Sequence, residues 1–118
     1  MPWSFTSDMP VYLQIAKIIK LRILKGEYLP GTRIPSVREL AQEAAVNPNT
    51  MQKALALLKS EGLLITQRTT GRTVTEHQEL IQSARRALVK DYIKQFSALD
   101  FSKEEINELI QESSQETT

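Results

Sequence analysis

The sequence predicts a mainly α-helical protein that contains one small β-hairpin, and three observations support this prediction. Apolar residues recur at helical spacing in several separate stretches of the chain. The stretch LLITQRTTGRTVT, residues 63–75, is instead rich in β-branched residues around a Thr-Thr-Gly centre, which favours two short strands joined by a turn. The 118 residues, 41% of them hydrophobic, are enough for one modest core and a short extension.

The first helix is predicted over residues 10–25, where apolar side chains are spaced to lie on one face. Its apolar residues are Val11, Ile15, Ile18, Ile19 and Ile23. Gly26 is its natural end, because glycine readily adopts the left-handed conformation that closes a helix. The following LPGTRIPS is a connector, since Pro30 and Gly31 indicate a turn and Pro35 disfavours helical backbone at the residue before it.

Two further helices follow, separated by a short break. Ser36 and Glu39 form a capping box, which predicts a second helix over residues 36–44. Asn47 is a good N-cap residue and Pro48 suits the first helical position, so a third helix is predicted to begin there and to end at the glycine of EGLL. The predicted buried face of this helix consists of Met51, Ala54, Leu55 and Leu58.

The C-terminal part of the chain is predicted to be helical as well. Residues 76–96 have a long helical pattern that is too thinly apolar to bury itself alone. Ser102 and Glu105 form a second capping box, and Phe101 is placed to pack on Ile106 as a hydrophobic staple. These patterns divide the chain into a domain of residues 1–75, a helical segment of residues 76–112 and a polar tail of residues 113–118.

Charge is divided unevenly between these parts. Residues 1–75 carry ten Lys and Arg residues against five Asp and Glu residues, a net charge of +5. Residues 76–118 carry five basic and nine acidic residues, a net charge of −4. Such an asymmetry indicates a part that binds a polyanion joined to a part that does not.

Several classes of protein are excluded by what the sequence lacks. It contains no cysteine, which excludes disulfides and thiolate metal sites. It has no basic N-terminal region leading into an apolar run, and no segment approaches the roughly 20 apolar residues of a membrane span. It has no Gly-rich phosphate loop or nucleophile elbow, and His77 stands without a second metal ligand. We therefore expect a soluble cytoplasmic protein that is not an enzyme, with no cofactor, no metal and no membrane partner.

The order helix, short helix, tight connector, third helix and hairpin is that of a winged helix-turn-helix domain. The major groove of B-DNA is about 12 Å wide and admits one α-helix, whose first turns face the base edges. The third helix suits this role because it is apolar on one side and rich in hydrogen-bonding groups at its leading end. We therefore expect double-stranded DNA as the partner. The candidate DNA contacts are Arg38, Asn49, Thr50, Gln52, Lys53, Arg68, Thr70, Gly71 and Arg72.

Different roles are expected for these side chains. The amides and hydroxyl of Asn49, Thr50 and Gln52 can address base edges or nearby phosphates. Arg38 and Lys53 are candidates for contacts to phosphate or guanine. The two arginines of the hairpin, or wing, can reach a flanking minor groove, and its glycine allows a close approach to the DNA backbone.

Residues 10–74 contain an ordered set of short motifs, namely Gly26, Pro30-Gly31, Pro35-Ser36, Arg38, Leu40-Ala41, Val46, Thr50 and Glu61-Gly62-Leu63. In this order they resemble the DNA-binding domain of the GntR family of bacterial transcriptional regulators. The NPNT motif and the short C-terminal segment resemble the YtrA-like subfamily, whose members often sit beside ABC-transporter genes and repress them. The resemblance implies a repressor that binds a palindromic operator.

The resemblance also bears on single residues. Arg38 matches a DNA-contacting position of the family, and Thr70-Gly71 matches the wing tip. Many members carry arginine where this chain has Pro48 and Gln52, so those two contacts are not carried over. The wing contact stays open between Arg68 and Arg72.

The C-terminal helices carry apolar residues for which a winged helix has no need, so we expect them to form a homodimer. Pairing would give the two-fold arrangement that palindromic operators mirror. Roughly forty residues are too few for the effector-binding domain of larger family members, so no small-molecule effector is expected. Two alternatives remain open: a winged-helix protein-interaction module without specific DNA binding, and a helical hairpin that closes the core of a monomer. The candidate dimerisation residues are Ile81, Leu88, Tyr92, Phe96, Ile106 and Leu109.

Overall fold

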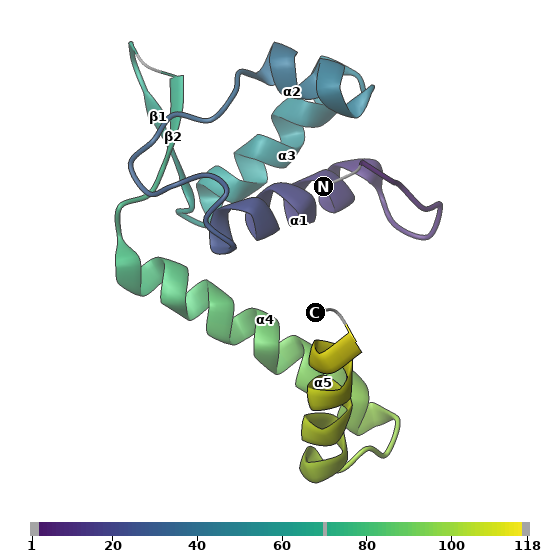
Figure 1. The fold of residues 1–118 in the computed structure, drawn as a ribbon. Helices are drawn as coiled ribbons and strands as arrows, with labels where there is room; N and C mark the ends of the chain where they lie inside the picture. The colour runs from purple at the N-terminus through teal and green to yellow at the C-terminus, as the bar shows by residue number, and fades with distance from the viewer. Residues whose placement is uncertain (1–2, 70, 117–118) are drawn as a thin grey trace. The chain divides into compact units, whose positions relative to one another are not determined.

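The structure is a computed structural model that describes residues 3–69 and 71–116 (Figure 1). The described residues form two compact units, the first ending at Ile81 and the second beginning at Gln82. The fold is mainly helical with one two-stranded antiparallel hairpin, as predicted. Along the chain the elements are α1 (Val11–Leu24), α2 (Val37–Ala44), α3 (Pro48–Ser60), β1 (Leu64–Gln67), β2 (Gly71–Val74), α4 (Gln78–Ala98) and α5 (Lys103–Glu116).

The core of the first unit lies between α1, α2, α3 and the hairpin. α1 packs most extensively on α3, and α2 and β1 also pack on α3. Ile15 and Ile19 of α1 and Met51 and Leu55 of α3 are fully buried. The four residues predicted for the buried face of α3 are all buried, which confirms the predicted orientation of this helix.

Local caps set the beginnings of α2 and α3. The Oγ atom of Ser36 accepts a hydrogen bond from the backbone N–H of Glu39 at 3.1 Å. The Oδ1 atom of Asn47 accepts one from the backbone N–H of Asn49 at 2.8 Å. Both caps were predicted, because short polar side chains satisfy the N–H groups that the first helical turn leaves open. α2 ends at Ala45, whose φ of 56° lies in the left-handed region.

The predicted hairpin is present and forms the wing. Leu64 lies opposite Val74 at its base, and Gln67 lies opposite Gly71 beside the turn. Both base residues are buried, which anchors the hairpin on the core. Gly71 has a φ of +79°, a conformation that residues with a side chain rarely adopt.

The connector between α1 and α2 runs along the free edge of β2. The backbone N–H of Val74 donates to the carbonyl of Thr32 at 2.9 Å, and the N–H of Ile34 donates to the carbonyl of Arg72 at 3.0 Å. These bonds place Arg33 beside the wing, a position that its place in the sequence does not indicate. Backbone hydrogen bonds and one isolated bridge thus tie the connector to the wing.

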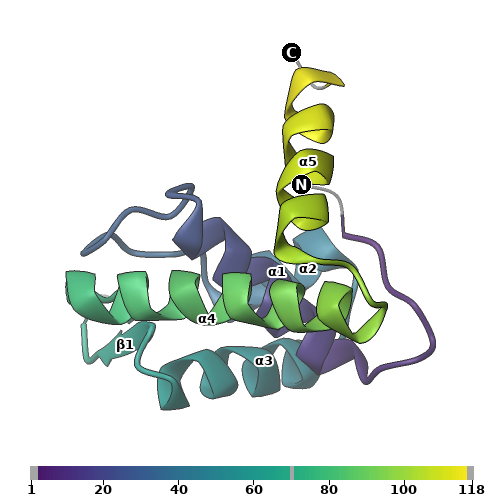
Figure 2. The same cartoon turned by 90° about the horizontal axis from the view of Figure 1, so that it is seen from below.

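α4 is one continuous helix of 21 residues, and it begins and ends slightly later than the predicted 76–96 (Figure 2). In the second unit, Ser102 and Glu105 form the predicted capping box, in which each side chain accepts a hydrogen bond from the other residue's N–H at 3.1 Å. Phe96 and Phe101 meet edge to face with their ring centroids 5.9 Å apart. Ile106 of α5 is buried.

The first turn of α4 belongs to the first unit. Ile81 is only 4% exposed. A Cβ atom at Gly62 would lie 3.0 Å from Cδ2 of Leu80, so this turn packs closely on the segment after α3. The division between the compact units therefore falls after Ile81, whereas the sequence places a change of character after Thr75. The division into a DNA-binding domain of residues 1–75, a dimerisation segment of residues 76–112 and a polar tail stays a prediction.

Candidate nucleic-acid interface

The leading end of α3 presents polar side chains to solvent. Asn49 and Gln52 are exposed, and Thr50 is half-buried. The buried stripe of the helix begins at Met51, so Asn49 lies on the opposite side of the first turn, and Thr50 and Gln52 flank the stripe. The amides of Asn49 and Gln52 have no side-chain hydrogen bond to other described residues, which leaves their donors and acceptors available to a ligand.

Lys53 is exposed but is not directed away from the protein. Its Nζ atom lies 4.1 Å from the centre of the Tyr12 ring, which α1 supplies. A cation above an aromatic ring at an exposed site gains about 0.5–1 kcal/mol. The ammonium group is therefore held near α1, a placement that the residue's position on α3 alone does not predict.

α2 and α3 are joined by a tight turn. The backbone N–H of Val46 donates to the carbonyl of Ala41 at 3.0 Å, which closes the end of α2. Arg38 lies in the first turn of α2 and is exposed, whereas Leu40 and Ala44 of the same helix are buried. α2 therefore packs on the core through one face and presents Arg38 on the other.

The wing carries the two predicted arginines in different settings. Arg68 is exposed and follows β1 directly, at the turn. Arg72 lies within β2 opposite Thr66 and is half-buried. Gly71 is exposed beside the turn, and Thr70 lies outside the described residues.

Arg33 is a further cationic side chain at the wing that was not among the predicted contacts. It is exposed and lies opposite Thr73 of β2 in an antiparallel bridge. Within residues 3–69 and 71–116 its guanidinium makes no ion pair or hydrogen bond. No local sequence pattern places Arg33 at the wing, because the connector has the sequence of an irregular turn and its pairing with β2 joins residues far apart in the chain.

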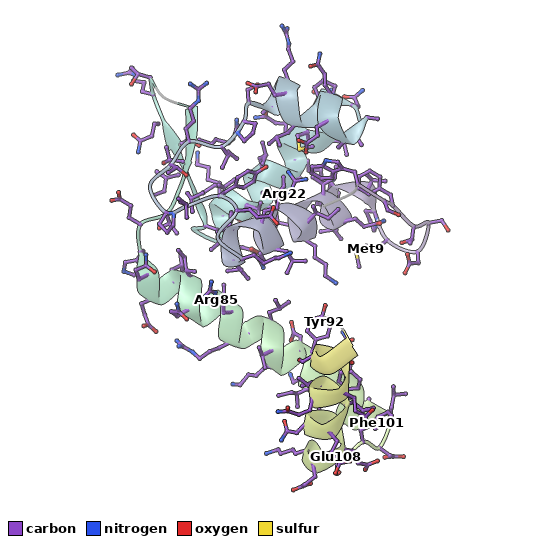
Figure 3. The ribbon with its side chains drawn as sticks, viewed as in Figure 1. Met9, Arg22, Arg85, Tyr92, Phe101 and Glu108 are labelled. Atoms are coloured by element: carbon purple, nitrogen blue, oxygen red, sulfur yellow. The ribbon has the colours of Figure 1, made fainter. Side chains whose placement is uncertain are left out.

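A charged cluster joins α2 to α1 through Glu43 of α2 and Arg22 of α1. The Nη1 atom of Arg22 lies 3.1 Å from Oε2 of Glu43, and it also donates to the hydroxyl of Tyr28 at 2.7 Å. The Nε1–H of Trp3 donates to the same Glu43 oxygen at 2.6 Å, and the Arg22 guanidinium lies 4.7 Å from the centre of the Trp3 ring. Figure 3 shows Arg22 inside this part of the molecule. The cluster joins the N-terminal segment, α1 and α2.

The ionisation of the cluster follows from these contacts. Burial by itself lowers the pKa of Arg22, but the hydrogen bonds with Tyr28 and Glu43 outweigh it and raise that pKa. Burial by itself raises the pKa of Glu43, but the hydrogen bonds from Trp3 and Arg22 outweigh it and lower that pKa. The pair is therefore charged at neutral pH, and it holds the helix that precedes α3.

Comparison with known proteins identifies the fold and its family. The family model for the bacterial regulatory proteins of the gntR family matches residues 11–74. The HTH-type transcriptional regulator YhcF of Bacillus subtilis is 37% identical over 109 residues, which cover 89% of this chain and 90% of YhcF. The HTH-type transcriptional repressor YtrA of the same organism is 38% identical over 90 residues, which cover 75% of this chain and 69% of YtrA. The chain belongs to the GntR family.

Solved structures of GntR-family members support the same conclusion. A GntR family transcriptional regulator from Listeria monocytogenes superposes with a TM-score of 0.77 at 34% identity, covering 92% of this chain and 98% of that one. The DNA-binding domain of AraR in complex with operator ORR3 superposes with a TM-score of 0.56 at 33% identity, covering 64% of this chain and 90% of that one. This GntR-family chain is a DNA-binding transcriptional regulator with a winged helix-turn-helix fold, and not an enzyme.

The GntR-family likeness extends past the wing. The alignment with YhcF and the superposition on the Listeria structure both cover most of the chain, so they include C-terminal helices as well as the DNA-binding domain.

In the part of the chain that the structure describes, no group of His, Asp or Glu residues is placed to hold a metal ion. None of the described helices is long and apolar enough to span a membrane. The DNA contacts of individual residues remain predictions.

Proposed function

We propose that this chain is a dimeric repressor that binds a palindromic operator through α3 and the wing, and that it controls an operon such as one for an ABC transporter. One observation carries the proposal. The leading end of α3 presents the exposed amides of Asn49 and Gln52, and exposed arginines without described partners flank it on α2 and on the wing. Amides read base edges, while arginines bind the phosphate backbone, so the two requirements of a specific DNA contact occur together.

The charge distribution supports the same partner. The net charge of +5 on residues 1–75 attracts a polyanion, whereas the net charge of −4 on residues 76–118 repels it. Arg38, Arg68 and Arg72 are the predicted cationic contacts whose guanidinium groups make no hydrogen bond, ion pair or ring contact with other described residues. Lys53 differs from them, because its ammonium lies over Tyr12. We therefore assign the phosphate contacts first to the arginines.

The test is a binding titration with the full chain. A DNA fragment from upstream of the chain's own gene is compared with random DNA of equal length, at several salt concentrations. A specific regulator should bind the upstream fragment about 10³-fold or more tightly than random DNA, and both affinities should fall with salt as counterions are released. Equal affinity for both fragments, or no salt dependence, would contradict the proposal and favour a protein-interaction module.

The dimer is proposed from the second unit and its exposed apolar side chains. On α4, Val89, Tyr92 and Ile93 are exposed, and on α5 so are Leu109 and Ile110. Tyr92 is labelled on α4 in Figure 3. These apolar groups recur at helical spacing, and a second copy of the chain would cover them.

The candidate dimerisation residues divide into two groups. Ile81 is buried in the first unit, and Ile106 is buried within the second, so a single chain already covers both. Leu88 and Phe96 are half-buried, and Tyr92 and Leu109 are exposed. We therefore assign the dimer contact to the last four. Sedimentation of the wild type at micromolar concentration tests this, and a monomer there would contradict it.

Repression is proposed from the resemblance to the YtrA-like subfamily and from the relative named as a repressor. A protein bound over a promoter excludes the polymerase, so no further domain is required for this activity. A reporter gene placed downstream of the bound fragment should be expressed more strongly when the gene that encodes this chain is deleted. Lower expression after deletion would identify an activator instead.

A further inference from the structure

The outer face of the wing carries Arg33, which has no assigned role. Arg33 lies opposite Thr73, and Thr73 lies opposite Ile65 of β1. Residues directly opposite each other on neighbouring strands point their side chains to the same face of the sheet. Ile65 is exposed, so Arg33 shares a solvent face with it. Both residues line one open hollow on this face.

Arg72 belongs to the other face of the same sheet. It comes directly before Thr73 in β2, and successive side chains of a strand point to opposite faces. Val74, two residues after Arg72, is buried in the core, which identifies this second face as the inner one. The wing thus carries one guanidinium group on each of its faces.

The Arg33 side chain extends along the sheet toward the turn. A Cβ atom at Gly71 would lie 3.5 Å from Nε of Arg33, so this guanidinium passes beside the residue that ends the turn. Gly71 leaves room there that a side chain would reduce. Glu76 lines the same hollow but does not pair with Arg33 among the described residues. The five N–H donors of Arg33 are therefore available to an external anion.

We propose that Arg33 binds phosphates of one DNA strand from the outer face of the wing, while Arg72 binds phosphates of the other strand from the inner face. The minor groove is about 6 Å wide and is bordered by the phosphates of both strands. A sheet with its side chains is about 10 Å thick, so only the tip of the wing can enter such a groove. Groups on its two faces then meet the two phosphate rows.

This arrangement rests on the proposed binding of DNA, and it adds a residue and a geometry to it. Guanidinium groups bind phosphate through two parallel hydrogen bonds, and such contacts fix position without reading sequence. Arg33 comes from the connector and Arg72 from β2, so the pairing of these two segments sets the separation of the two groups. Arg68, at the turn, is left to address the floor of the groove.

The first arm of the test measures the salt dependence of binding with full-length Arg33→Ala, Arg33→Lys and Lys59→Ala. The probe is a duplex selected by the wild type from random DNA. Arg33→Ala should weaken binding to all sequences alike and reduce the salt slope by about 0.9 per subunit. Arg33→Lys keeps the charge and should keep most of the slope. Lys59 lies in the last turn of α3, outside the wing, and its loss should leave the slope unchanged.

The second arm assigns the strands. Single phosphates flanking the selected site are replaced by neutral methylphosphonates, first on one strand and then on the other. Within one half-site, replacements that weaken the wild type but not Arg33→Ala should all lie on one strand, and those that spare Arg72→Ala should lie on the other. The two strands exchange these roles in the second half-site, because a two-fold axis relates the half-sites. If both variants are insensitive on the same strand of one half-site, the two-sided arrangement is wrong.

The outcomes separate this inference from the proposed function. If the wild type selects a sequence and Arg33→Ala binds it with unchanged affinity and slope, the role of Arg33 is refuted while DNA binding stands. An unchanged slope with lost preference at one base pair would move Arg33 to base reading and also refute it. If the wild type selects no sequence at all, both proposals fail. Circular dichroism and thermal melting of each variant confirm that it is folded.

Discussion

The two compact units of this protein bury their apolar residues to very different extents. In the described chain, every buried hydrophobic residue except Ile106 lies in the first unit, from Ile15 of α1 to Ile81 of α4. In the second unit, Leu99 is 69% exposed and Val89 is 56% exposed. The first unit therefore has a core of its own, whereas the second leaves most of its apolar surface uncovered.

The unequal burial indicates which region depends on a partner. In the first unit α1, α2 and β1 pack on α3 and cover its apolar face. The polar and charged residues on the outside of this unit are therefore not needed for its core and can bind a partner. The second unit consists of two helices, and a pair of helices has too little interior to bury both apolar faces. We expect the first unit to determine stability and DNA recognition, and the second to determine association.

The largest effect is expected from truncating a core residue of the first unit. Leu55 is fully buried on α3, so Leu55→Ala should lower the free energy of unfolding by about 2–5 kcal/mol. Leu99→Ala, at an exposed position of the second unit, should change it by less than about 0.5 kcal/mol. Urea denaturation of both variants measures this. Similar losses at the two positions would contradict the contrast between the units.

A second prediction concerns association. Leu88→Lys combined with Tyr92→Lys should give a monomer, because buried charges without partners oppose the proposed pairing of helices. Operator affinity should then fall by about 10²-fold or more, since the two half-sites are no longer bound together. Ser83→Lys combined with Ser97→Lys adds the same charge at exposed polar positions of α4 away from the Leu88 and Tyr92 stripe, and serves as the control. Analytical ultracentrifugation and DNA binding measure both pairs.

A third prediction addresses the reading face of α3. If Gln52 contacts a base edge, Gln52→Ala should cost about 1–3 kcal/mol at one base pair of each half-site, with little loss on random DNA. Asn47→Ala is the control, because it removes a cap and should lower stability by about 1 kcal/mol without changing base preference. Binding to a panel of single-base operator variants separates the two. A preference profile that Gln52→Ala leaves intact would place Gln52 in solvent.

The smallest effect is expected at the charged cluster behind α2. The pKa of Glu43 is lowered below its ordinary value of 4.5 in the folded chain. The Glu43 carboxylate therefore contributes stability when the pH is above the ordinary pKa of glutamate, and this contribution is lost as the pH falls through the folded pKa. Glu43→Gln should reduce stability at pH 7, and the difference from the wild type should shrink as the pH is lowered toward 3 through the folded pKa. Trp3 is the only tryptophan and touches this carboxylate, so its fluorescence follows the unfolding.

The control for the charged cluster is Glu39→Gln, which removes an exposed carboxylate from the same helix. Glu39 makes no ion pair with another described residue, so its loss should alter stability less at pH 7 than the loss of Glu43. Equal effects of the two variants at both pH values would show that Glu43 acts through the general charge of α2 and not through Arg22 and Trp3.

Much of the fold is determined by short stretches of sequence. Ser36, Asn47 and Ser102 begin their helices where the sequence predicts, because each cap is a contact between residues two or three positions apart. The buried face of α3 and the hairpin at residues 64–74 likewise follow from local periodicity and turn chemistry. The order of these elements, together with the ordered motifs of residues 10–74, was enough to predict the family.

Other features depend on how the elements pack. Local patterns account for the elements, the unequal charge of the two parts and the polar leading end of α3. The pairing of Arg33 with β2, the position of Lys53 over Tyr12 and the burial of Ile81 depend on residues far apart in the chain. Periodicity reports which face of an element is apolar, but it does not report which neighbour that element meets. Because those neighbours are set by packing, the geometry of the wing became visible only when the chain was folded.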